Sequence, residues 1–369
     1  MKSFLSSHWV KLLLIVVGAI AVVLVTKYDD QLYRQPIFEI QQVQTKSTTK
    51  ITDDFNNPDT QTKQVLTGIV TNGKYRGKQL QINNTYSHSH GMDIKYRAGQ
   101  KVFLNYHVHP KFHATIKNLK RDTVVVFLGY LVIVLLLVLL KRSGLLTLIS
   151  IVINSILFIG AIQLNRLTNG GPVIVIFSIL AVVFCVITLG LVLGFNRQTW
   201  ITLCAALGGT ICALLLSWLV FIITKEKGVY YESMEFVTQL PKPLLATEIL
   251  IGVLGAVMDE ATDIVASLFA LKQENPQITT KQIFDSGRKI GSSIMGPLIN
   301  VLFFVFMGET LPMTLLFLKN GNSWGYSFSM NMSLGMISSL ISAIGIVMTV
   351  LLASLFTSLW LKGQTKWEP

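Results

Sequence analysis

Eight runs of mainly apolar residues, each about 20 residues long, constrain this sequence more than any other feature. They cover residues 9–26, 123–140, 145–164, 172–194, 199–223, 244–271, 296–318 and 332–361. A helix of about 20 apolar residues matches the hydrocarbon thickness of a bilayer. Charged residues make up only 14% of the chain, against roughly 25% in soluble proteins. The sequence therefore predicts an α-helical integral membrane protein with about eight transmembrane helices.

The basic residues of the connections predict the orientation. They gather in alternate connections, on the side of Lys2 and Lys11, at residues 141–142, 197, 272–289 and 362–366. Such loops are typically cytoplasmic. We expect the protein to lie in the plasma (cytoplasmic) membrane, with both termini in the cytoplasm. Residues 1–26 form an uncleaved signal anchor, residues 123–361 a seven-helix membrane domain, and residues 362–369 a cytoplasmic tail. The net charge of +12 lacks the compact basic patch or motif of a nucleic-acid partner.

The long polar segment 27–122 is predicted to lie outside the membrane. Residues 27–62 are expected to be mobile, and residues 63–120 to be rich in strands, because short alternating runs at 65–70, 79–82 and 102–106 are separated by turn signals. This pattern favours a small β-barrel-like domain of the OB or SH3 type between the first two helices. The segment contains no cysteine, so it folds without disulfides.

Five of the six histidines fall in this outer segment: His88, His90, His107, His109 and His113. His107 and His109, two apart on a strand, would project from one face. Grouped imidazoles can bind a transition metal. Solvated polar positions on a strand and its loop are the alternative, which we favour because no cysteine or carboxylate completes a ligand set. No cofactor is predicted, apart from a possible bound cation and this possible metal.

The run 244–271 differs from the other runs because it holds four acidic residues: Glu248, Asp259, Glu260 and Asp263. Charged groups in a membrane span are costly and point to function. Helical spacing from Glu248 places Gly252, Gly255, Asp259 and Asp263 on one small, acidic face. We expect this face to point into the bundle, at a partner or a water-filled cavity, with the opposite apolar face toward lipid or apolar neighbours. Two carboxylates one turn apart would share a proton or a bound cation.

A glycine-proline pair predicts a helix break beside this acidic run. A capping box at Thr279 and Gln282 starts a helix that runs to Gly296-Pro297, followed by Asn300. Broken helices expose backbone groups that bind ions in transporters. Ser293 and Asn300, near the break, complete the predicted ion- or substrate-binding set with Asp259, Asp263, Glu248 and Glu260.

Residues 252–312 resemble the YibE/YibF-like family of bacterial multi-pass membrane proteins. The matching elements are Gly255-Ala256-Val257-Met258-Asp259, Ser286-Gly287-Arg288, Met295-Gly296, Asn300 and Leu311-Pro312. The resemblance extends more loosely over residues 120–361, and the outer N-terminal domain is similar to that of the longer, YibE-type member. It implies a related YibF-type membrane protein as a partner. Family members often have a small residue at position 263 and an acid at position 293, where this chain has Asp263 and Ser293.

Three functions are compatible with these features, and transport is the leading hypothesis. A transporter or permease, or a subunit of one, would use the acidic site for a cation or proton that moves by itself or drives a small solute. The alternative is a scaffold or accessory subunit of a cell-envelope complex. An enzyme is not expected, because aspartyl proteolysis needs aspartates from different helices and no Gly-x-Ser-x-Gly elbow is present.

Overall fold

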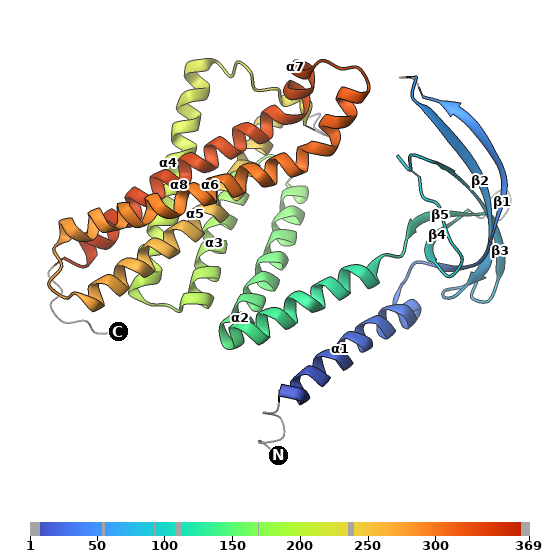
Figure 1. Cartoon of the computed structure of the whole chain (residues 1–369), viewed down its shortest axis with the longest axis horizontal. Coiled ribbons are helices and arrows are strands. Elements are labelled where there is room, and N and C mark those ends of the chain that lie inside the picture. The colour runs from blue at the N-terminus through green and yellow to red at the C-terminus, as the bar shows by residue number, and fades with distance from the viewer. Residues whose placement is uncertain are drawn as a thin grey trace. The chain divides into compact units, whose positions relative to one another are not determined.

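The computed structural model describes residues 8–53, 56–91, 93–107, 113–168, 170–234 and 240–362 (Figure 1). The chain forms two compact units, residues 1–141 and residues 142–369. The first unit contains α1 (His8–Tyr28), a 3-10 turn (Asp29–Leu32), a β-sheet and the first half of α2 (Asp122–Leu167). The second unit contains the rest of α2 and the helices that follow it.

The domain near the N-terminus contains one five-stranded antiparallel sheet. The alternating runs predict three of its strands, and the β-barrel-like arrangement of the OB or SH3 type stays a prediction. The strands of the sheet are β1 (Ile37–Thr52), β2 (Pro58–Val70), β3 (Gln79–Ser87), β4 (Lys101–His107) and β5 (His113–Leu119), in the order β3-β2-β1-β4-β5. The predicted strands at 65–70, 79–82 and 102–106 lie in β2, β3 and β4. Phe38, Leu66, Val70 and Val102 form the centre of the core on one face of the sheet.

The expectation that residues 27–62 are mobile is wrong for the residues that the structure describes there. β1 runs from Ile37 to Thr52 and pairs along its length with β2, with register irregularities near Gln42 and Ser47. Beyond Ile40 its side chains are largely exposed on both faces. The strand therefore carries no apolar-polar alternation, and its many threonines, which favour extended backbone, are the remaining signal.

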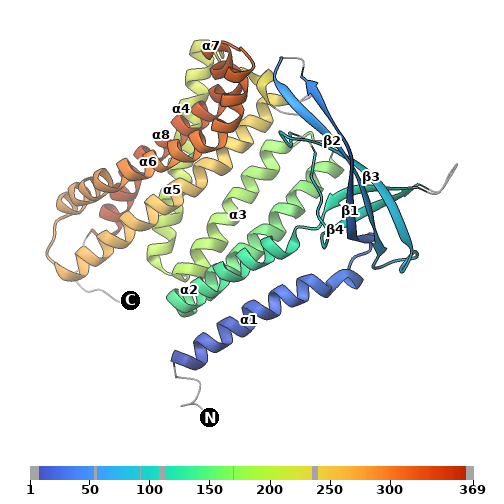
Figure 2. The same ribbon diagram turned by 45° about the vertical axis from the view of Figure 1, so that its right-hand side comes forward.

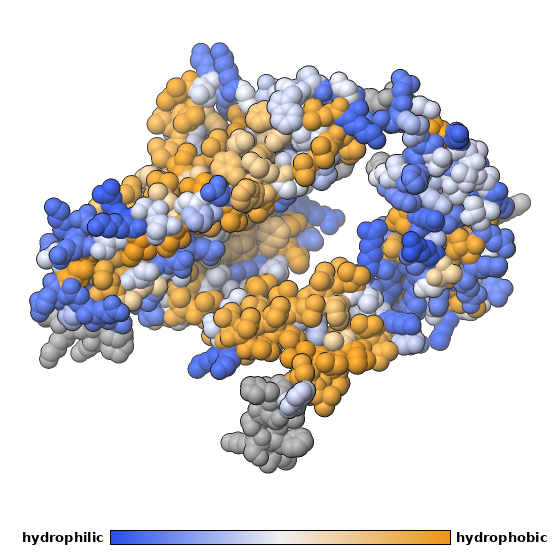
Figure 3. Space-filling view, viewed as in Figure 1, coloured by the Kyte–Doolittle hydropathy of each residue, from blue (hydrophilic) through white to orange (hydrophobic). Residues whose placement is uncertain are grey.

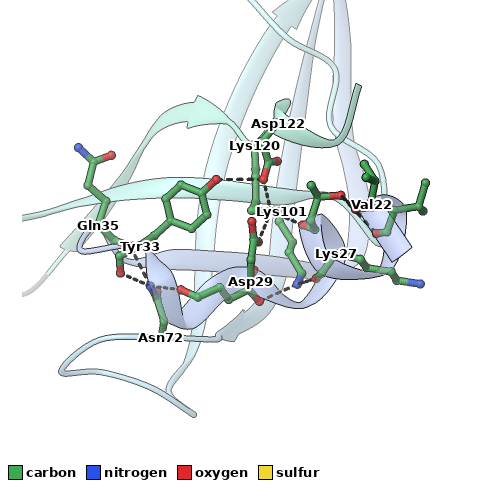
Figure 4. Close-up of polar contacts among 12 residues, drawn as sticks. Val22, Lys27, Asp29, Tyr33, Gln35, Asn72, Lys101, Lys120 and Asp122 are labelled. Carbon is green, nitrogen blue, oxygen red and sulfur yellow. Dashed lines mark hydrogen bonds and ion pairs between the residues drawn. The ribbon is translucent and has the colours of Figure 1, made fainter. Parts of the chain in front are cut away.

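A cluster of buried charges ties α1, the sheet and α2 together within the first unit (Figure 4). The Lys120 Nζ atom lies 2.7 Å from Asp29 Oδ1 and 2.7 Å from Asp122 Oδ2. The Tyr33 hydroxyl also donates to Asp122, at 3.0 Å. Lys101 pairs with Asp30 at 2.6 Å. The charges at this junction are thus compensated by direct partners, which is the condition for burying them without a large loss of stability.

Asn72 fastens the same junction through its side-chain amide. Its Oδ1 atom accepts a hydrogen bond from the Ile37 amide at 2.6 Å, and its Nδ2 atom lies within 3.0 Å of the carbonyl oxygens of Asp30, Tyr33 and Gln35. The sequence marks Asn72-Gly73 only as a turn. In the structure the asparagine satisfies backbone groups of the segment that links α1 to β1.

The second unit is a bundle of α3 (Val173–Leu193), α4 (Arg197–Thr224), α5 (Pro241–Glu274), α6 (Thr280–Lys319) and α8 (Ser333–Trp360), with a short α7 (Trp324–Ser327) between the last two. α5 and α8 are central to it: α5 contacts α3, α4, α6 and α8 (Figure 2). α2 covers both predicted runs 123–140 and 145–164, which meet at Lys141, where the backbone is not helical (φ 51°, ψ −116°).

Six helices in the described part of the chain are long and apolar enough to cross a membrane, by length and composition. Their segments are Leu12–Leu32, α2, α3, α4, α6 and Trp324–Trp360. α2 spans two of the eight predicted runs, and α5, which contains the four acidic residues, is not among the six. Figure 3 shows the hydrophobic surface of α1 and of the first half of α2, in contrast to the largely hydrophilic surface of the sheet.

Glycines allow α8 to approach α4 and α6 closely. A Cβ atom at Gly209 of α4 would collide with Thr349, and one at Gly291 of α6 would collide with Val350. Close backbone approach at small residues is the usual basis of helix packing in membranes. In contrast, a Cβ atom at Gly252 or Gly255 of α5 would meet nothing within 4 Å. The bundle therefore has packed glycines on α4 and in the first part of α6, whereas both glycines of α5 are open, as are Gly296 and Gly308 further along α6.

We predict that Lys120→Met destabilises the first unit by about 3–5 kcal/mol, because it leaves Asp29 and Asp122 buried without their cation. The matched control is Lys117→Met on the exposed surface of β5, with an expected change within about 0.5 kcal/mol. Thermal unfolding of the full-length protein in detergent, followed by near-ultraviolet circular dichroism, measures both. Equal effects of the two substitutions would contradict the role given to the cluster.

The same cluster predicts an alkaline limit to stability. Burial alone would lower the pKa of Lys120, but its hydrogen bonds to Asp122 and Asp29 outweigh this effect and raise the pKa above its usual value. Burial, with the hydrogen bond to Asp122, raises the pKa of Tyr33. Both shifts favour the protonated forms in the folded state, so their contribution is complete below the unfolded pKa values, near 10. It is lost as pH rises through the folded values, and Lys120→Met should flatten this alkaline loss.

We also predict opposite effects for two glycine substitutions. Gly291→Ala forces α6 away from Val350 and costs about 1–3 kcal/mol. Gly255→Ala meets open space and gains up to about 1 kcal/mol from helix propensity. The thermal midpoints of the two variants, measured in the same detergent, should therefore lie on opposite sides of the wild-type value. A loss of stability in Gly255→Ala would show that this face of α5 is packed.

Candidate functional site

The apolar face of α5 forms the centre of the bundle. Val253, Val257, Ile264 and Leu268 are all fully buried. They belong to one hydrophobic cluster with Ala213 of α4 and with Ile341 and Val350 of α8. These side chains make van der Waals contacts with α4 and α8 along the whole face. This packing fixes the rotation of α5 about its own axis.

The small, acidic face of α5 consequently points away from the core. Glu248, Asp259 and Asp263 are exposed in the chain, as are Gly252 and Gly255. The expectation that this face points into the bundle, at a partner or a water-filled cavity, is confirmed for Asp259 and Asp263, which line a cavity, but not for Gly252 and Gly255, which meet open space. The large apolar side chains of the other face make more van der Waals contacts with α4 and α8 than these glycines could. Small residues allow close packing, but they do not require it.

Three of the four acidic residues nevertheless lie around one pocket. Asp259, Glu260 and Asp263 line a cavity of about 440 Å³ in the second unit. The opposite walls come from Thr147 of α2, Thr188 of α3, and Ile294 and Leu298 of α6. Thr262 of α5 and apolar residues from α3 and α5 complete the lining. The pocket therefore places carboxylates from one helix against hydroxyl and apolar groups from three others.

Glu260 is the most unusual member of this set. Its exposed fraction is 0%, so its side chain borders the pocket from beneath the accessible surface. Neither carboxylate oxygen has a hydrogen-bond partner among the residues that the structure describes. A buried carboxylate without a partner is very costly in its charged form, so the neutral, protonated acid is the form that suits this position.

Thr188, which lines the pocket, has two polar partners on α2 behind it, and the sequence-based prediction lacks all three residues. Asn154 of α2 donates from Nδ2 to the Thr188 hydroxyl oxygen at 2.8 Å, and the Ser150 hydroxyl donates to the same oxygen at 3.2 Å. Ser150 and Asn154 lie one helical turn apart, which is the signal that could have revealed them. Single polar residues in an apolar run gave no reason to choose this turn over others.

The remaining predicted residues do not line this pocket. Glu248 lies more than two turns before Asp259, and Ser293 and Asn300 are exposed on α6, where their side chains donate to the carbonyl oxygens of Ile290 and Gly296. The predicted break at Gly296-Pro297 is wrong, because α6 is one helix from Thr280 to Lys319. A proline removes one backbone hydrogen bond, and a long helix can continue past that loss. The capping box of Thr279 and Gln282 is confirmed.

The structure describes the side chains of two of the five histidines of the segment 27–122. His88 and His90 are exposed, and His90 stacks on Tyr86 and lies 3.6 Å from Asp93. His109 and the side chains of His107 and His113 lie outside the described residues. No three side chains of the metal-binding types come together in the part of the chain that is described. Metal binding by these histidines stays a prediction.

Comparison with known protein families matches almost the whole chain. The family described as YibE/F-like protein matches residues 128–363, and the YibE/F family N-terminal domain matches residues 31–119. The chain belongs to the YibE/F-like family. The first match runs from residue 128 in α2 through α8 and includes the acidic pocket, and the second match covers the sheet. No curated protein and no solved structure matches this YibE/F-like chain significantly.

The burial of Glu260 predicts that the site costs stability. Glu260→Met replaces an unpaired buried acid with an apolar side chain of similar length, and should stabilise the protein by about 1–3 kcal/mol. Glu274→Met, at the exposed end of α5, is the matched control and should change little. Thermal unfolding in detergent compares the two. A less stable Glu260→Met would mean that the carboxyl group has a stabilising partner.

Proposed function

We propose that this YibE/F-like protein is a multi-pass membrane transporter or permease, or a subunit of one, that moves a cation or proton through the acidic pocket of α5. The observation that carries this proposal is Glu260, an acid with an exposed fraction of 0% and no hydrogen-bond partner among the described residues, beside Asp259 and Asp263. A purely structural carboxylate at such a place would be expected to have a basic or hydrogen-bonding partner.

In this proposal the protein lies in the cytoplasmic membrane with about eight transmembrane helices. α2 supplies two of them, on either side of Lys141, and α5 is the span that the acidic residues make atypical. Residues 27–122 lie outside and both termini inside, as the distribution of basic residues favours. The pocket then lies within the bilayer, where a charge has no bulk water to stabilise it.

The chemistry of the pocket fits an ion that is bound and released. Asp259 and Asp263 are separated by one helical turn and face the pocket, so they can attract a cation. Glu260 lies beneath them and is best accommodated as a neutral acid. A cation or proton that enters the pocket therefore encounters two accessible carboxylates and one buried carboxyl group. Its transfer from one group to another would change the net charge of the site.

Flux measurements on reconstituted protein test this proposal. Proteoliposomes with a pH-sensitive dye inside are subjected to a potassium diffusion potential, and separate samples carry gradients of Na⁺ or Mg²⁺. Glu260→Gln and Asp259→Asn should each lower the flux at least about tenfold, which corresponds to 1.4 kcal/mol on the barrier. Glu274→Gln, on the same helix and exposed, should retain it. If the fluxes of protons, Na⁺ and Mg²⁺ were all the same in wild type and Glu260→Gln, the proposal would be overturned.

A second function is favoured by the open face of α5. Gly252 and Gly255 have nothing near them within the described chain, and Glu248 is exposed on the same face. Open glycines are a typical docking surface for another transmembrane helix. As an accessory subunit of an envelope complex, the protein would bind a related YibF-type membrane protein here. Asp259→Asn would then weaken complex formation, measured by co-purification, more than it weakens flux.

A further inference from the structure

The hydrogen bonds of the Thr188 hydroxyl, which lines the pocket, limit the ligands that this hydroxyl can bind. The Thr188 hydroxyl oxygen has two lone pairs. One accepts from Asn154 Nδ2 at 2.8 Å and the other from the Ser150 hydroxyl at 3.2 Å. With both lone pairs occupied, this oxygen is a poor ligand for a metal cation. What Thr188 has left is its O–H hydrogen.

That hydrogen has no acceptor among the residues that the structure describes, although Thr188 lines the pocket. Other threonines of these helices donate to the carbonyl one turn before them, as Thr210 does to Ala206 and Thr262 to Met258. Thr188 does not share this arrangement in the described contacts. It therefore presents a spare donor at the wall that faces Asp259, Glu260 and Asp263.

We propose that Thr188, oriented by Asn154 and Ser150, is the donor that stabilises the ionised form of the pocket carboxylates, and that the pocket consequently binds a proton rather than a metal ion. This inference rests on the proposed function and names the ion. A hydrogen-bond donor favours the charged form of an acid. A metal ion would need several ligand oxygens around it, and Thr188 would add none, because both of its lone pairs already accept hydrogen bonds.

The distribution of charge agrees with a proton. Asp259, Glu260 and Asp263 are the titratable residues of the pocket lining, and the walls from α2, α3 and α6 contribute hydroxyl and apolar side chains only. Among the described residues, no three acidic, histidine or cysteine side chains converge closely enough to hold a metal. In the exchange step, a carboxylic O–H bond breaks and its proton passes to water in the pocket. The negative charge left on the carboxylate accepts the Thr188 O–H, directly or through water.

Asn154 and Ser150 act through Thr188 and are positioning residues. Their donors occupy the lone pairs of the Thr188 oxygen, so that its hydrogen is turned away from α2. Loss of the Asn154 amide would free one lone pair and let the Thr188 hydroxyl rotate. The effect on proton exchange should have the same direction as loss of the hydroxyl, and should be smaller.

The test is proton flux against pH in proteoliposomes of the full-length protein, with Thr188→Val, Thr188→Ser and Asn154→Ala. Valine keeps the shape of threonine and removes the donor, whereas serine keeps the donor. We expect Thr188→Val to lower proton flux at neutral pH about tenfold and to move the midpoint of its pH profile up by about one pH unit. Thr188→Ser should retain both, and Asn154→Ala should show a smaller upward movement.

The outcomes separate this inference from the proposed function. If Glu260→Gln abolishes flux of Na⁺ or Mg²⁺ while wild type conducts no protons, the acidic pocket transports a metal ion and the inference is overturned. A Thr188→Val protein whose proton flux and pH midpoint match the wild type overturns it also. If Glu260→Gln leaves all fluxes intact, the proposed function itself fails.

Equal thermal midpoints of Thr188→Val and Thr188→Ser show that both are folded. Should Thr188→Val fail to fold, the pH midpoint of Asn154→Ala decides: an upward movement supports the inference and an unchanged midpoint overturns it.

Discussion

The burial of the apolar face of α5 determines where the carboxylates of this protein lie. Val253, Val257, Ile264 and Leu268 have no exposed surface, and Gly345 of α8 lets Val253 and Val257 approach its backbone. Once this face is fixed, helical geometry puts Asp259 and Asp263 on the other side. Glu260 is three residues after Val257 and four before Ile264, so it lies on the first face and is buried with it. The packing of the bundle and the geometry of the pocket are therefore a single arrangement.

The two units of the chain treat buried charge in opposite ways. In the first unit, Lys120 and Lys101 each meet carboxylates at 2.6–2.7 Å, so that charge is neutralised by fixed partners. In the second unit, Glu260 has no such partner among the described residues. Fixed ion pairs stabilise the fold and do not exchange an ion. An unpaired buried acid lowers the stability of the protein, and proteins commonly retain such a destabilising residue where function requires it.

Some features of this fold follow from sequence because one local signal is sufficient. Apolar length predicts the long helices, and Thr279 with Gln282 predicts the start of α6. Alternation predicts the runs within β2, β3 and β4. β1 escapes this reasoning beyond Ile40, because its side chains are exposed on both faces and show no alternation. The continuity of α6 through Pro297 could not be predicted either. A proline removes one backbone hydrogen bond, and the sequence does not show whether packing against neighbouring helices compensates for that loss.

The candidate site needed information that no single helix contains. Asp259, Glu260 and Asp263 could be chosen from the sequence because acids are rare in apolar runs. Which of them is buried could not, since that depends on how α5 rotates against α4 and α8. Thr188 could not be found either, because its partners Ser150 and Asn154 are on α2 and its role arises only when α2 and α3 pack.

The open side of the pocket connects the two proposed functions. Ionised Asp259 and Asp263 cannot face hydrocarbon, so water or a second protein has to cover them within a bilayer. If water alone covers these carboxylates, the open glycines of this face, Gly252 and Gly255, have no role in the site. A partner helix would use those glycines for close approach and would convert a half-open pocket into a closed path. In either arrangement Glu260 stays on the inner side, so the exchanging acid belongs to this chain even if the outer wall does not.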